Sequence, residues 1–519
     1  MHPLTKKDLN LFYILITVLF AYVINFAITN PTILTKEFPP KLPTTVFVSL
    51  QFITKLLFII FSLEPIATRK RCYTLIILLL LHLIIPLSYR LKYHPAVMDV
   101  MIIFTGIYSF KMSLFIKYNR KYLPDTKINQ QKEFTPYILT LNSWRHNSDI
   151  ESKAEIKKPT IKQVNEKIKS HVLMLMLKVT IYELAIYLFA NYPQKVPERP
   201  YQIRMIEYFT KGIPIFTAAS MFHYTCFFIF IYLFLSLHYD LTVLYSLIAL
   251  RCMTTSQSST PEKHILVKSG LLTPIQFSLL KNYFITYTFN TKHCFNNPWI
   301  SKNPREVWSS RWQTMLAETF RELGYLPLRN LCISLGITSR KFCNAMGVLG
   351  AFFISSLLHE YYIIGMFNMI TGEHLFFFMS HGLIMIVWEL VFTSEREDKM
   401  KKPEKEGYDF RKHAAVFLKW LLMLAIYMLI LPAFTEPLMR RIDLWIIPSL
   451  FTDREKSCEP IEATNTYRIR PSNQVIDDDI MSHCRVVKEV IFFHKANLGT
   501  LFQLYVNPNL ILHFYNLLI

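Results

Sequence analysis

Apolar runs long enough to cross a lipid bilayer account for much of this 519-residue chain. An α-helix needs ~20 apolar residues to span ~30 Å of hydrocarbon, and about nine runs meet that length. With 52% apolar residues and a mean hydropathy of +0.26, the composition also departs from that of a soluble enzyme. We therefore predict an all-α, polytopic integral membrane protein with about nine transmembrane helices plus re-entrant or interfacial helices. The runs lie at about 10–29, 44–63, 72–88, 95–116, 171–192, 212–237, 346–367, 374–392 and 414–434.

Two runs raise separate questions. The first, 10–29, follows Lys6 and Lys7 and shows no small-residue cleavage site, so we expect it to remain as a signal anchor. A tenth run, Tyr239–Met253, is short and follows His238 without a polar break. We expect this run to be re-entrant or interfacial instead of a further crossing.

The distribution of charge gives the topology. A net charge of +20 would favour nucleic acid as the partner of a soluble chain, but here Lys and Arg gather in particular loops. Loops 118–170 and 254–341 are predicted to face the cytosol, and 193–211 and the tail after 434 the opposite side. The expected partner is the lipid bilayer and not nucleic acid, and the sequence sets no oligomeric state. The predicted segments are N-terminal transmembrane helices 1–117, a cytosolic polar loop 118–170, a core 171–434 and a C-terminal tail 435–519.

Cysteine and histidine spacing gives no metal site. The eight cysteines include no C-x-x-C pair, and Cys458 and Cys484 fall in the tail, where an oxidising compartment would permit a disulfide. The pair His359-Glu360 begins like the zinc motif H-E-x-x-H, but Ile363 occupies the position of the second ligand. We therefore predict no metal.

His359 and Glu360 lie inside the run at 346–367. An ionisable group in hydrocarbon costs ~2.5–3.5 kcal/mol even on lenient insertion scales, so such residues are commonly functional. The structural alternative is a histidine that is satisfied by a neighbouring helix.

A second polar region, Cys294–Gln313, combines tryptophans with arginine outside the apolar runs. Asn303 and Pro304 fit the cap and first turn of a helix that we expect to continue towards Arg321. On that helix Trp308, Arg311, Trp312 and Met315 would share one face. The simplest alternative is an interfacial helix anchored by tryptophan.

In motif order, these residues resemble the membrane-bound O-acyltransferases, within them the wax synthase-like branch. The family's Pro-Phe-x-x-Pro-like lead corresponds to Phe295 with Pro298, and its tryptophan-containing core motif corresponds to Val307–Gln313. Its Arg-x-x-x-Tyr-x-Pro element is matched by Arg321 with Tyr325 and Pro327. Its intramembrane His-Glu pair is matched by His359-Glu360. The match covers about 290–392. Ser309 and Ser310 replace the usual Gly and Arg, and Gln313 replaces Asn or His.

The resemblance implies helices that enclose an acyl chamber and an acyl-CoA-dependent O-acyltransferase. His359 would be the general base, because a neutral imidazole suits proton abstraction near pH 7. The Gln313 amide would stabilise the oxygen of the thioester carbonyl or orient the acyl group. No cofactor is implied, since acyl-CoA is a co-substrate. Further expected substrate-binding residues are Trp308, Arg311, Trp312, Glu360 and His381.

Arginine side chains favour phosphate, so we expect those in the predicted cytosolic loop to bind coenzyme A: Arg305, Arg311, Arg321 and Arg329, with Lys302. The acceptor would be a long-chain alcohol, a sterol or a terpenoid-like metabolite, and the membrane that of the endoplasmic reticulum. Two alternatives stay open, a secondary transporter with an intramembrane His/Glu relay and a non-catalytic scaffold that binds acyl-lipids.

Overall fold

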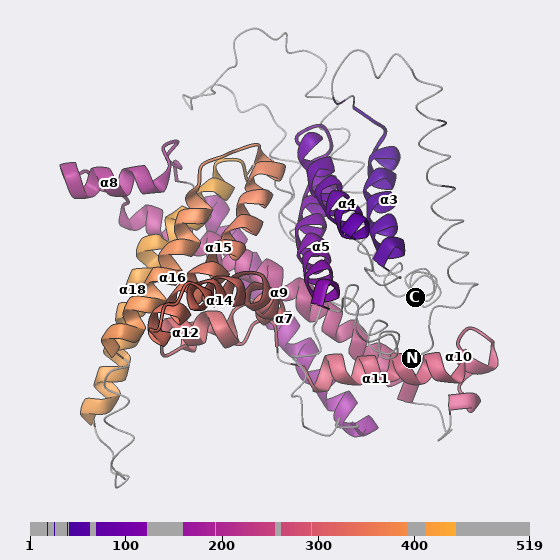
Figure 1. Cartoon of the computed structure of the whole chain (residues 1–519). Coiled ribbons are helices and arrows are strands. Elements are labelled where there is room, and N and C mark those ends of the chain that lie inside the picture. Colours follow the sequence, from indigo (N-terminus) through magenta and orange to yellow (C-terminus); the bar gives the residue numbers. More distant parts are fainter. Residues whose placement is uncertain are drawn as a thin grey trace, which may run out of the picture. The chain divides into compact units, whose positions relative to one another are not determined.

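The computed structural model describes residues 41–62, 69–121, 159–192, 194–254, 261–291, 293–392 and 410–442, with Val18, Asn25 and Pro39 singly (Figure 1). The elements within these ranges are helices. The longer ones are α3 Thr44–Ser62, α4 Arg69–Ser88, α5 Pro95–Lys121, α7 Ile161–Asn191, α8 Tyr201–Lys211, α9 Ala218–Thr254, α11 Pro274–Phe289, α14 Leu326–Ser334, α15 Arg340–Phe367, α16 Glu373–Phe392 and α18 Phe410–Met439. Short helical turns are η2 Pro261–Lys263, α10 Ile265–Lys268, η3 Pro298–Ile300, α12 Pro304–Glu306, η4 Val307–Arg311, η5 Thr314–Leu316, α13 Ala317–Phe320 and η6 Arg321–Tyr325.

The prediction of an all-α, polytopic membrane protein is confirmed. Within the described ranges, 7 helices are long and apolar enough to cross a membrane, namely α3, α5, α7, α9, α15, α16 and α18. The predicted span 72–88 lies in α4, whose apolar part, Cys72–Ser88, is shorter. The predicted span 10–29 lies outside the described residues apart from Val18 and Asn25. The count of nine is therefore not confirmed.

Of the two forms expected for Tyr239–Met253, re-entrant and interfacial, the structure contradicts the re-entrant one. These residues continue α9, which runs unbroken for 37 residues from Ala218 to Thr254. The helix contains neither proline nor glycine, so nothing in the sequence ends it at His238. At 1.5 Å per residue it extends about 55 Å, well beyond the hydrocarbon thickness of ~30 Å.

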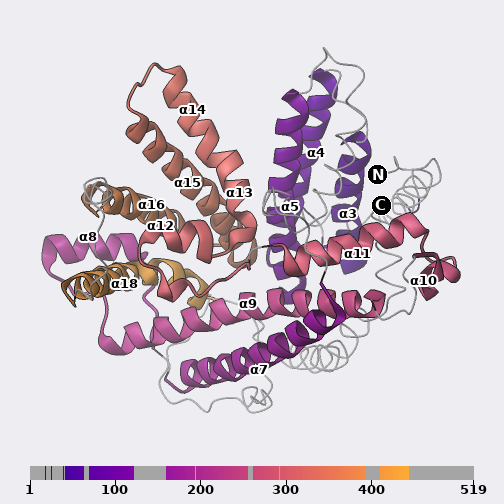
Figure 2. The same cartoon turned by 90° about the horizontal axis from the view of Figure 1, so that it is seen from below.

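Helices α7 and α9 pack side by side (Figure 2). Lys178 of α7 pairs with the Asp240 carboxylate of α9 and donates a 2.7 Å hydrogen bond to the Ser236 hydroxyl. The Nε2 of His171 donates to the Asp240 carbonyl oxygen at 2.9 Å. A buried carboxylate is costly unless it is paired, so these contacts favour one register of the two helices.

The first three described helices share a polar seam. The Gln51 side chain of α3 donates to the Thr105 hydroxyl of α5 at 2.6 Å and to the His82 carbonyl oxygen of α4 at 3.0 Å. All three residues are buried. Directional hydrogen bonds between spanning helices set their rotation, which apolar packing alone leaves less defined.

Helix α15 carries His359 and packs on α5, α14, α16 and the π-helical turn η6. Glycines allow the closest of these approaches. A Cβ added to Gly350 would lie 2.5 Å from the carbonyl oxygen of Gly324 in η6, and one added to Gly365 would lie 2.4 Å from Ile102 of α5. Atoms do not approach this closely, and because the Gly324 oxygen belongs to the backbone, the first contact requires glycine at position 350, whereas the Ile102 side chain at the second can shift.

Residues 261–277 belong to a smaller unit, separate from the larger unit that holds most of the described helices. The described part of the smaller unit holds η2, α10 and the start of α11. His264 caps α10, because its Nδ1 accepts a hydrogen bond from the Leu266 N–H at 3.2 Å. The His264 ring also lies 4.5 Å from the Phe277 ring.

Candidate active site

His359 has one ring nitrogen engaged by the backbone. Its Nδ1 is 2.9 Å from the carbonyl oxygen of Ser355, one turn earlier in α15. Because a carbonyl oxygen only accepts, Nδ1 carries the hydrogen and Nε2 keeps the lone pair of the neutral ring. The ring lies 4.3 Å from that of Phe378 in α16 and 5.9 Å from that of Phe434 in α18. The histidine thus offers a proton-accepting nitrogen among aromatic side chains.

A second histidine, His374, lies beside His359. The ring centroids are 5.8 Å apart, and the Nε2 of His374 donates to the carbonyl oxygen of Phe434 at 2.9 Å. His374 is 1% exposed and stacks on the Phe434 ring at 4.9 Å. This bond joins α16 to α18 directly beside the His359 ring.

The Glu360 carboxylate accepts a 3.0 Å hydrogen bond from the backbone N–H of Leu375. Leu375 is in the first turn of α16, where N–H groups have no partner within the helix. Glu360 therefore links α15 to the start of α16, in the manner of a capping side chain. Its predicted role in substrate binding stays a prediction.

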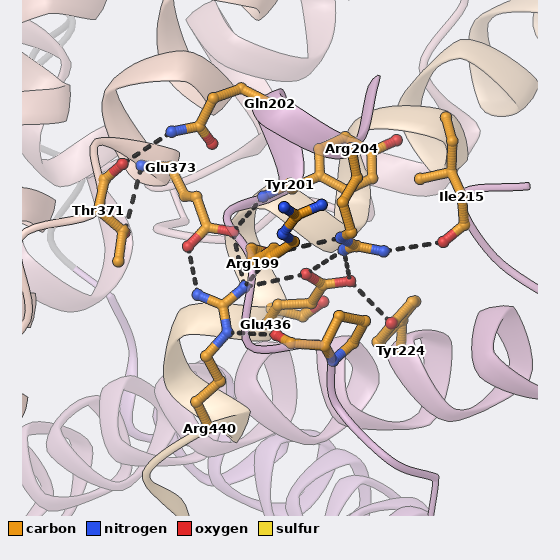
Figure 3. Close-up of polar contacts among 12 residues, drawn as sticks. Arg199, Tyr201, Gln202, Arg204, Ile215, Tyr224, Thr371, Glu373, Glu436 and Arg440 are labelled. Carbon is orange, nitrogen blue, oxygen red and sulfur yellow. Dashed lines mark hydrogen bonds and ion pairs between the residues drawn. The ribbon is translucent and has the colours of Figure 1, made fainter. Parts of the chain in front are cut away.

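A buried ionic network holds this end of the helices together (Figure 3). Glu373 and Glu436 are both 0% exposed. Arg440 binds Glu373 through two nitrogens, at 2.5 and 2.9 Å, and reaches Glu436 at 3.2 Å. Arg204 pairs with Glu436, whose Oε1 also accepts a 2.8 Å hydrogen bond from the Tyr224 hydroxyl.

The network connects four elements, since its members come from α8, α9, α16 and the end of α18. The backbone N–H of Tyr201, at the start of α8, donates to Glu373 at 2.7 Å. Glu373 directly precedes His374 in the chain, and Glu436 follows Phe434 by two residues. The network therefore fixes the backbone on both sides of the His359 ring.

The polar region Cys294–Gln313, the motif-bearing segment, begins as predicted and then departs from the prediction. Asn303 caps α12 by accepting from the Glu306 N–H at 2.9 Å, and Pro304 occupies its first turn. The expected continuous helix towards Arg321 is wrong. Trp312 N donates to the Val307 carbonyl oxygen at 2.7 Å, a bond that widens the turn into the π-helix η4.

This π-helix ends at Arg311, Trp312 follows in an extended conformation, and Gln313 then takes a left-handed conformation, with φ 45° and ψ 52°. The common face expected for Trp308, Arg311, Trp312 and Met315 is therefore not formed, because the helical repeat breaks at Gln313. A non-glycine residue in this region costs about 1–3 kcal/mol, a strain that is frequent at functional sites.

Backbone bonds on either side hold Gln313 in place. Thr314 N donates to the Cys294 carbonyl oxygen at 3.1 Å, and Asn296 N donates to the Arg311 carbonyl oxygen at 2.8 Å. Within the described ranges no hydrogen bond engages the Gln313 side-chain amide, and none joins it to His359. The amide is thus available to another group, although the structure does not bring it into contact with the histidine.

Trp308 and Trp312 anchor the segment in the core. The Trp308 ring lies 5.5 Å from Phe352 of α15 and 6.0 Å from Phe378 of α16. The Trp312 ring stacks on Phe228 of α9 at 5.6 Å. Because Phe378 also contacts His359, the two tryptophans and the histidine belong to one aromatic cluster.

Arg311 is held by contacts within its own loop. Its guanidinium binds the Glu306 carboxylate at 2.6 Å and the Asn296 carbonyl oxygen at 3.0 Å. Partial burial alone would raise the pKa of Glu306, but hydrogen bonds from the Lys302 backbone and from Arg311, with the charges of both, hold that pKa below its usual value. The pair therefore stabilises the loop as an ion pair near neutral pH, and substrate binding by Arg311 stays a prediction.

Side chains within the protein also bind the other arginines that we expected to bind coenzyme A. Arg305 pairs with Glu389 at 3.0 Å, Arg321 approaches Glu322 at 3.6 Å, and Arg329 donates to the Asn344 side chain at 3.0 Å. Arg305 and Arg321 remain largely exposed, at 69% and 60% of their side chains. An incoming phosphate can therefore reach these two more easily than Arg311, which is 19% exposed.

His381 lies deeper in α16 and is 2% exposed. Its Nδ1 hydrogen bonds the Phe377 carbonyl oxygen at 2.8 Å, which leaves the lone pair on Nε2 as in His359. The ring lies 5.1 Å from Trp308 and 4.7 Å from Tyr427 of α18. Tyr427 was not singled out by the sequence, where it looks like one more aromatic residue in an apolar run.

The sequence reasoning also missed the ionic network and His374. A signal for the network does exist, because Glu373 and Glu436 each lie at the end of an apolar run, on the side of the membrane that is also predicted for the loop containing Arg204. Which acid meets which arginine depends on the three-dimensional packing of four helices. No spacing along the chain gives that pairing.

Together, the fold and the site define a multi-pass helical membrane protein with histidines inside its spanning helices. Residues 291–380 match the sequence profile of the membrane bound O-acyl transferase family. The resemblance identified from the motif order is thus confirmed for this segment, and the chain is related to that family through it.

Plant proteins show the same relationship over a similar part of the chain. The probable long-chain-alcohol O-fatty-acyltransferase 2 of Arabidopsis thaliana is 32% identical over 93 residues, which are 17% of this chain and 26% of the relative. The probable long-chain-alcohol O-fatty-acyltransferase 3 of the same plant is 30% identical over 115 residues, 22% of this chain and 33% of the relative. The matched region is therefore about a quarter to a third of these relatives.

Proposed function

We propose that the protein is an acyl-CoA-dependent O-acyltransferase that esterifies the hydroxyl of a hydrophobic acceptor, with His359 as general base. One observation carries the proposal. The Ser355 carbonyl fixes the tautomer of His359 so that Nε2 bears the lone pair, within an aromatic cluster formed by the family-matched segment and spanning helices. The names of the plant relatives support the same class of reaction.

The proposed step transfers one acyl group without a covalent enzyme intermediate. His359 Nε2 takes the hydroxyl proton as the acceptor oxygen attacks the thioester carbonyl carbon. The carbon–sulfur bond then breaks, and the departing thiolate takes the proton back from the imidazolium. The aromatic surroundings limit the access of water, which would otherwise compete with the alcohol as the attacking group.

Gln313 would act on the carbonyl oxygen. Negative charge develops there as the hydroxyl attacks, and an amide donor held in a fixed position stabilises it. Its strained left-handed backbone and its unengaged side chain support this role. The contact with the substrate would bring the amide towards the reaction centre, since Gln313 does not touch His359 directly.

The donor is proposed to bind from the side of the basic loops, with Arg305 and Arg321 near its phosphates. The proposed acceptor is a long-chain alcohol, a sterol or a terpenoid-like metabolite that enters among the apolar helices. The proposed location is the endoplasmic reticulum membrane. Two other functions, a transporter and a non-catalytic scaffold, are distinguished by the assay below.

The test uses microsomes from cells that express the chain, supplied with radiolabelled palmitoyl-CoA and a panel of unlabelled acceptors. We expect labelled ester above the level of microsomes without the chain. Movement of label across sealed vesicles without ester formation would support the transporter, and retention of label on the protein alone would support the scaffold. Either result would contradict the acyltransferase.

A further inference from the structure

Polar side chains from three elements lie close together, namely Trp308 of η4, Tyr427 of α18 and His381 of α16. The Trp308 indole N–H of η4 lies beside the Tyr427 hydroxyl of α18. Both atoms are buried, and within the described ranges neither has a hydrogen-bond partner of acceptable geometry. The His381 ring of α16 lies 5.1 Å from the Trp308 ring and 4.7 Å from the Tyr427 ring.

Buried polar groups without partners are unusual, because burial removes their hydrogen bonds to water and nothing replaces them. Two such groups beside a third histidine therefore need an explanation. The Nδ1–H of His381 is bound to the Phe377 carbonyl oxygen, so Nε2 is an acceptor. The set then comprises an N–H donor, a hydroxyl that can donate or accept, and an acceptor nitrogen.

We propose that Trp308, Tyr427 and His381 form a subsite that binds one neutral hydrogen-bonding group of a substrate. The inference rests on the proposed function and assigns Tyr427, which lies outside the family-matched segment, a part in substrate binding. The bound group carries both an acceptor oxygen and an N–H or O–H donor. An amide in the pantetheine arm of the acyl donor and the hydroxyl of the acceptor both have this chemistry.

The surroundings exclude a charged group. Phe377 contacts the His381 ring at 4.2 Å, while Phe352 and Phe378 lie against Trp308. Within the part of the chain that the structure describes, none of the three polar side chains is paired with a formal charge, so an ion bound there would be desolvated without a counterion. The phosphates of coenzyme A would therefore lie elsewhere, towards the exposed arginines.

The position fits a substrate that extends to His359. Phe378 contacts Trp308 on one side, at 6.0 Å, and His359 on the other, at 4.3 Å. A ligand held at the subsite thus has its neighbouring atoms directed along the aromatic cluster that also borders the proposed base.

The experiment measures binding, not turnover. Purified protein in detergent is titrated with a non-hydrolysable thioether analogue of palmitoyl-CoA and, separately, with hexadecanol. Loss of one neutral hydrogen bond, about 0.5–1.5 kcal/mol, raises a dissociation constant by about 2- to 13-fold. We expect this increase in both Tyr427→Phe and Trp308→Phe. If the subsite binds the pantetheine amide, the dissociation constant of the thioether analogue rises. If it binds the acceptor hydroxyl, the dissociation constant of hexadecanol rises.

Thermal stability separates the subsite from a structural role. Since the Tyr427 hydroxyl makes no hydrogen bond of acceptable geometry within the described ranges, Tyr427→Phe should leave the melting temperature unchanged or higher. The matched control is Tyr93→Phe, whose hydroxyl donates to the Leu42 carbonyl oxygen at 2.9 Å. That change should lower the melting temperature and leave both dissociation constants unchanged.

The subsite is overturned if Tyr427→Phe changes neither dissociation constant, or if it only lowers the melting temperature. The two proposals fail in different ways. A wild-type protein that forms no ester, but whose ligand binding still depends on Tyr427, would contradict the proposed function and leave the subsite in place.

Discussion

At the scale of single residues, backbone carbonyls decide which nitrogen of each histidine can act. Ser355 and Phe377 each accept from an Nδ1–H one turn later, on His359 and His381. His374 differs, because its Nε2 donates to Phe434. The sequence shows that these histidines lie in apolar runs, but the identity of the proton-accepting nitrogen depends on contacts between atoms.

Gln313 provides the first prediction. If its amide stabilises the developing oxyanion, Gln313→Ala and Gln313→Glu should both lose most ester formation, by on the order of 10²-fold, as when an oxyanion-hole donor is removed. Gln313→Asn should not improve activity, since the site is built around the longer side chain and a shift of ~1 Å at a reacting centre can cost ~10²-fold. The measurement is initial ester formation at equal protein abundance. Full activity in Gln313→Ala would remove the residue from the mechanism.

At the scale of elements, the glycines of α15 position the helix that carries His359. A Gly350→Ala change places a methyl group against the backbone oxygen of Gly324, which cannot rotate away. We expect a lower melting temperature, with a loss of about 1–3 kcal/mol from overpacking. Gly106→Ala is the matched control, because its new methyl meets side chains and no backbone: the end of the flexible Leu358 side chain at 2.7 Å and the Tyr361 ring at 3.4 Å, an ordinary contact distance. Equal effects of the two changes would show that the backbone contact is unimportant.

The ionic network gives a third prediction. Arg440→Met leaves Glu373 buried with its strongest partner removed, and breaking such a pair costs about 3–5 kcal/mol. Adding Glu373→Gln removes the stranded charge, so the double variant should be more stable than the sum of the two single losses predicts. Equilibrium unfolding in detergent measures all three variants. Strictly additive losses would mean that Arg440 and Glu373 do not act as a pair.

Much of the element structure could be predicted from the sequence, and the exceptions have physical causes. The apolar runs predicted the membrane-spanning helices, because polar side chains are unfavourable in the hydrocarbon of a bilayer. Asn303 with Pro304 predicted the start of a helix. The break of the helix at Gln313 could not be predicted from the sequence, because the left-handed backbone there is stabilised by hydrogen bonds that join its neighbours to Cys294 and Asn296 across the loop. The continuation of α9 past His238 was missed because apolar length was taken as the limit of the helix.

At the scale of the whole molecule, the alternation of sides stays a prediction, and two contacts join elements that it assigns to one side. On the predicted cytosolic side, Lys117 near the end of α5 forms a 2.9 Å ion pair with Glu322 of η6. On the other side, Arg440 at the end of α18 binds the Pro197 carbonyl oxygen at 2.7 Å. The predicted pairing of Cys458 and Cys484 lies outside the described residues.

Single cysteines test this topology. In a background without other cysteines, Cys252 at the exposed end of α9 should react with a membrane-impermeant maleimide added to sealed microsomes. A cysteine introduced by Lys211→Cys, at the end of α8, should react only after permeabilisation, because the loop 193–211 is assigned to the opposite side. Rapid labelling of both positions in sealed vesicles would contradict the assignment.

The most direct measurement is ester formation by His359→Ala, with His238→Ala as control. His238 makes a similar bond from Nδ1 to the carbonyl oxygen four residues earlier, at 2.7 Å, but its ring is exposed on α9. We expect His359→Ala to lose at least ~10²–10⁴-fold of its acyl transfer from labelled palmitoyl-CoA, the usual contribution of a general base, while membrane abundance is maintained. His238→Ala should retain activity, and His381→Ala should lose less than His359→Ala. Substantial ester formation by a well-expressed His359→Ala protein would contradict the proposed role of His359.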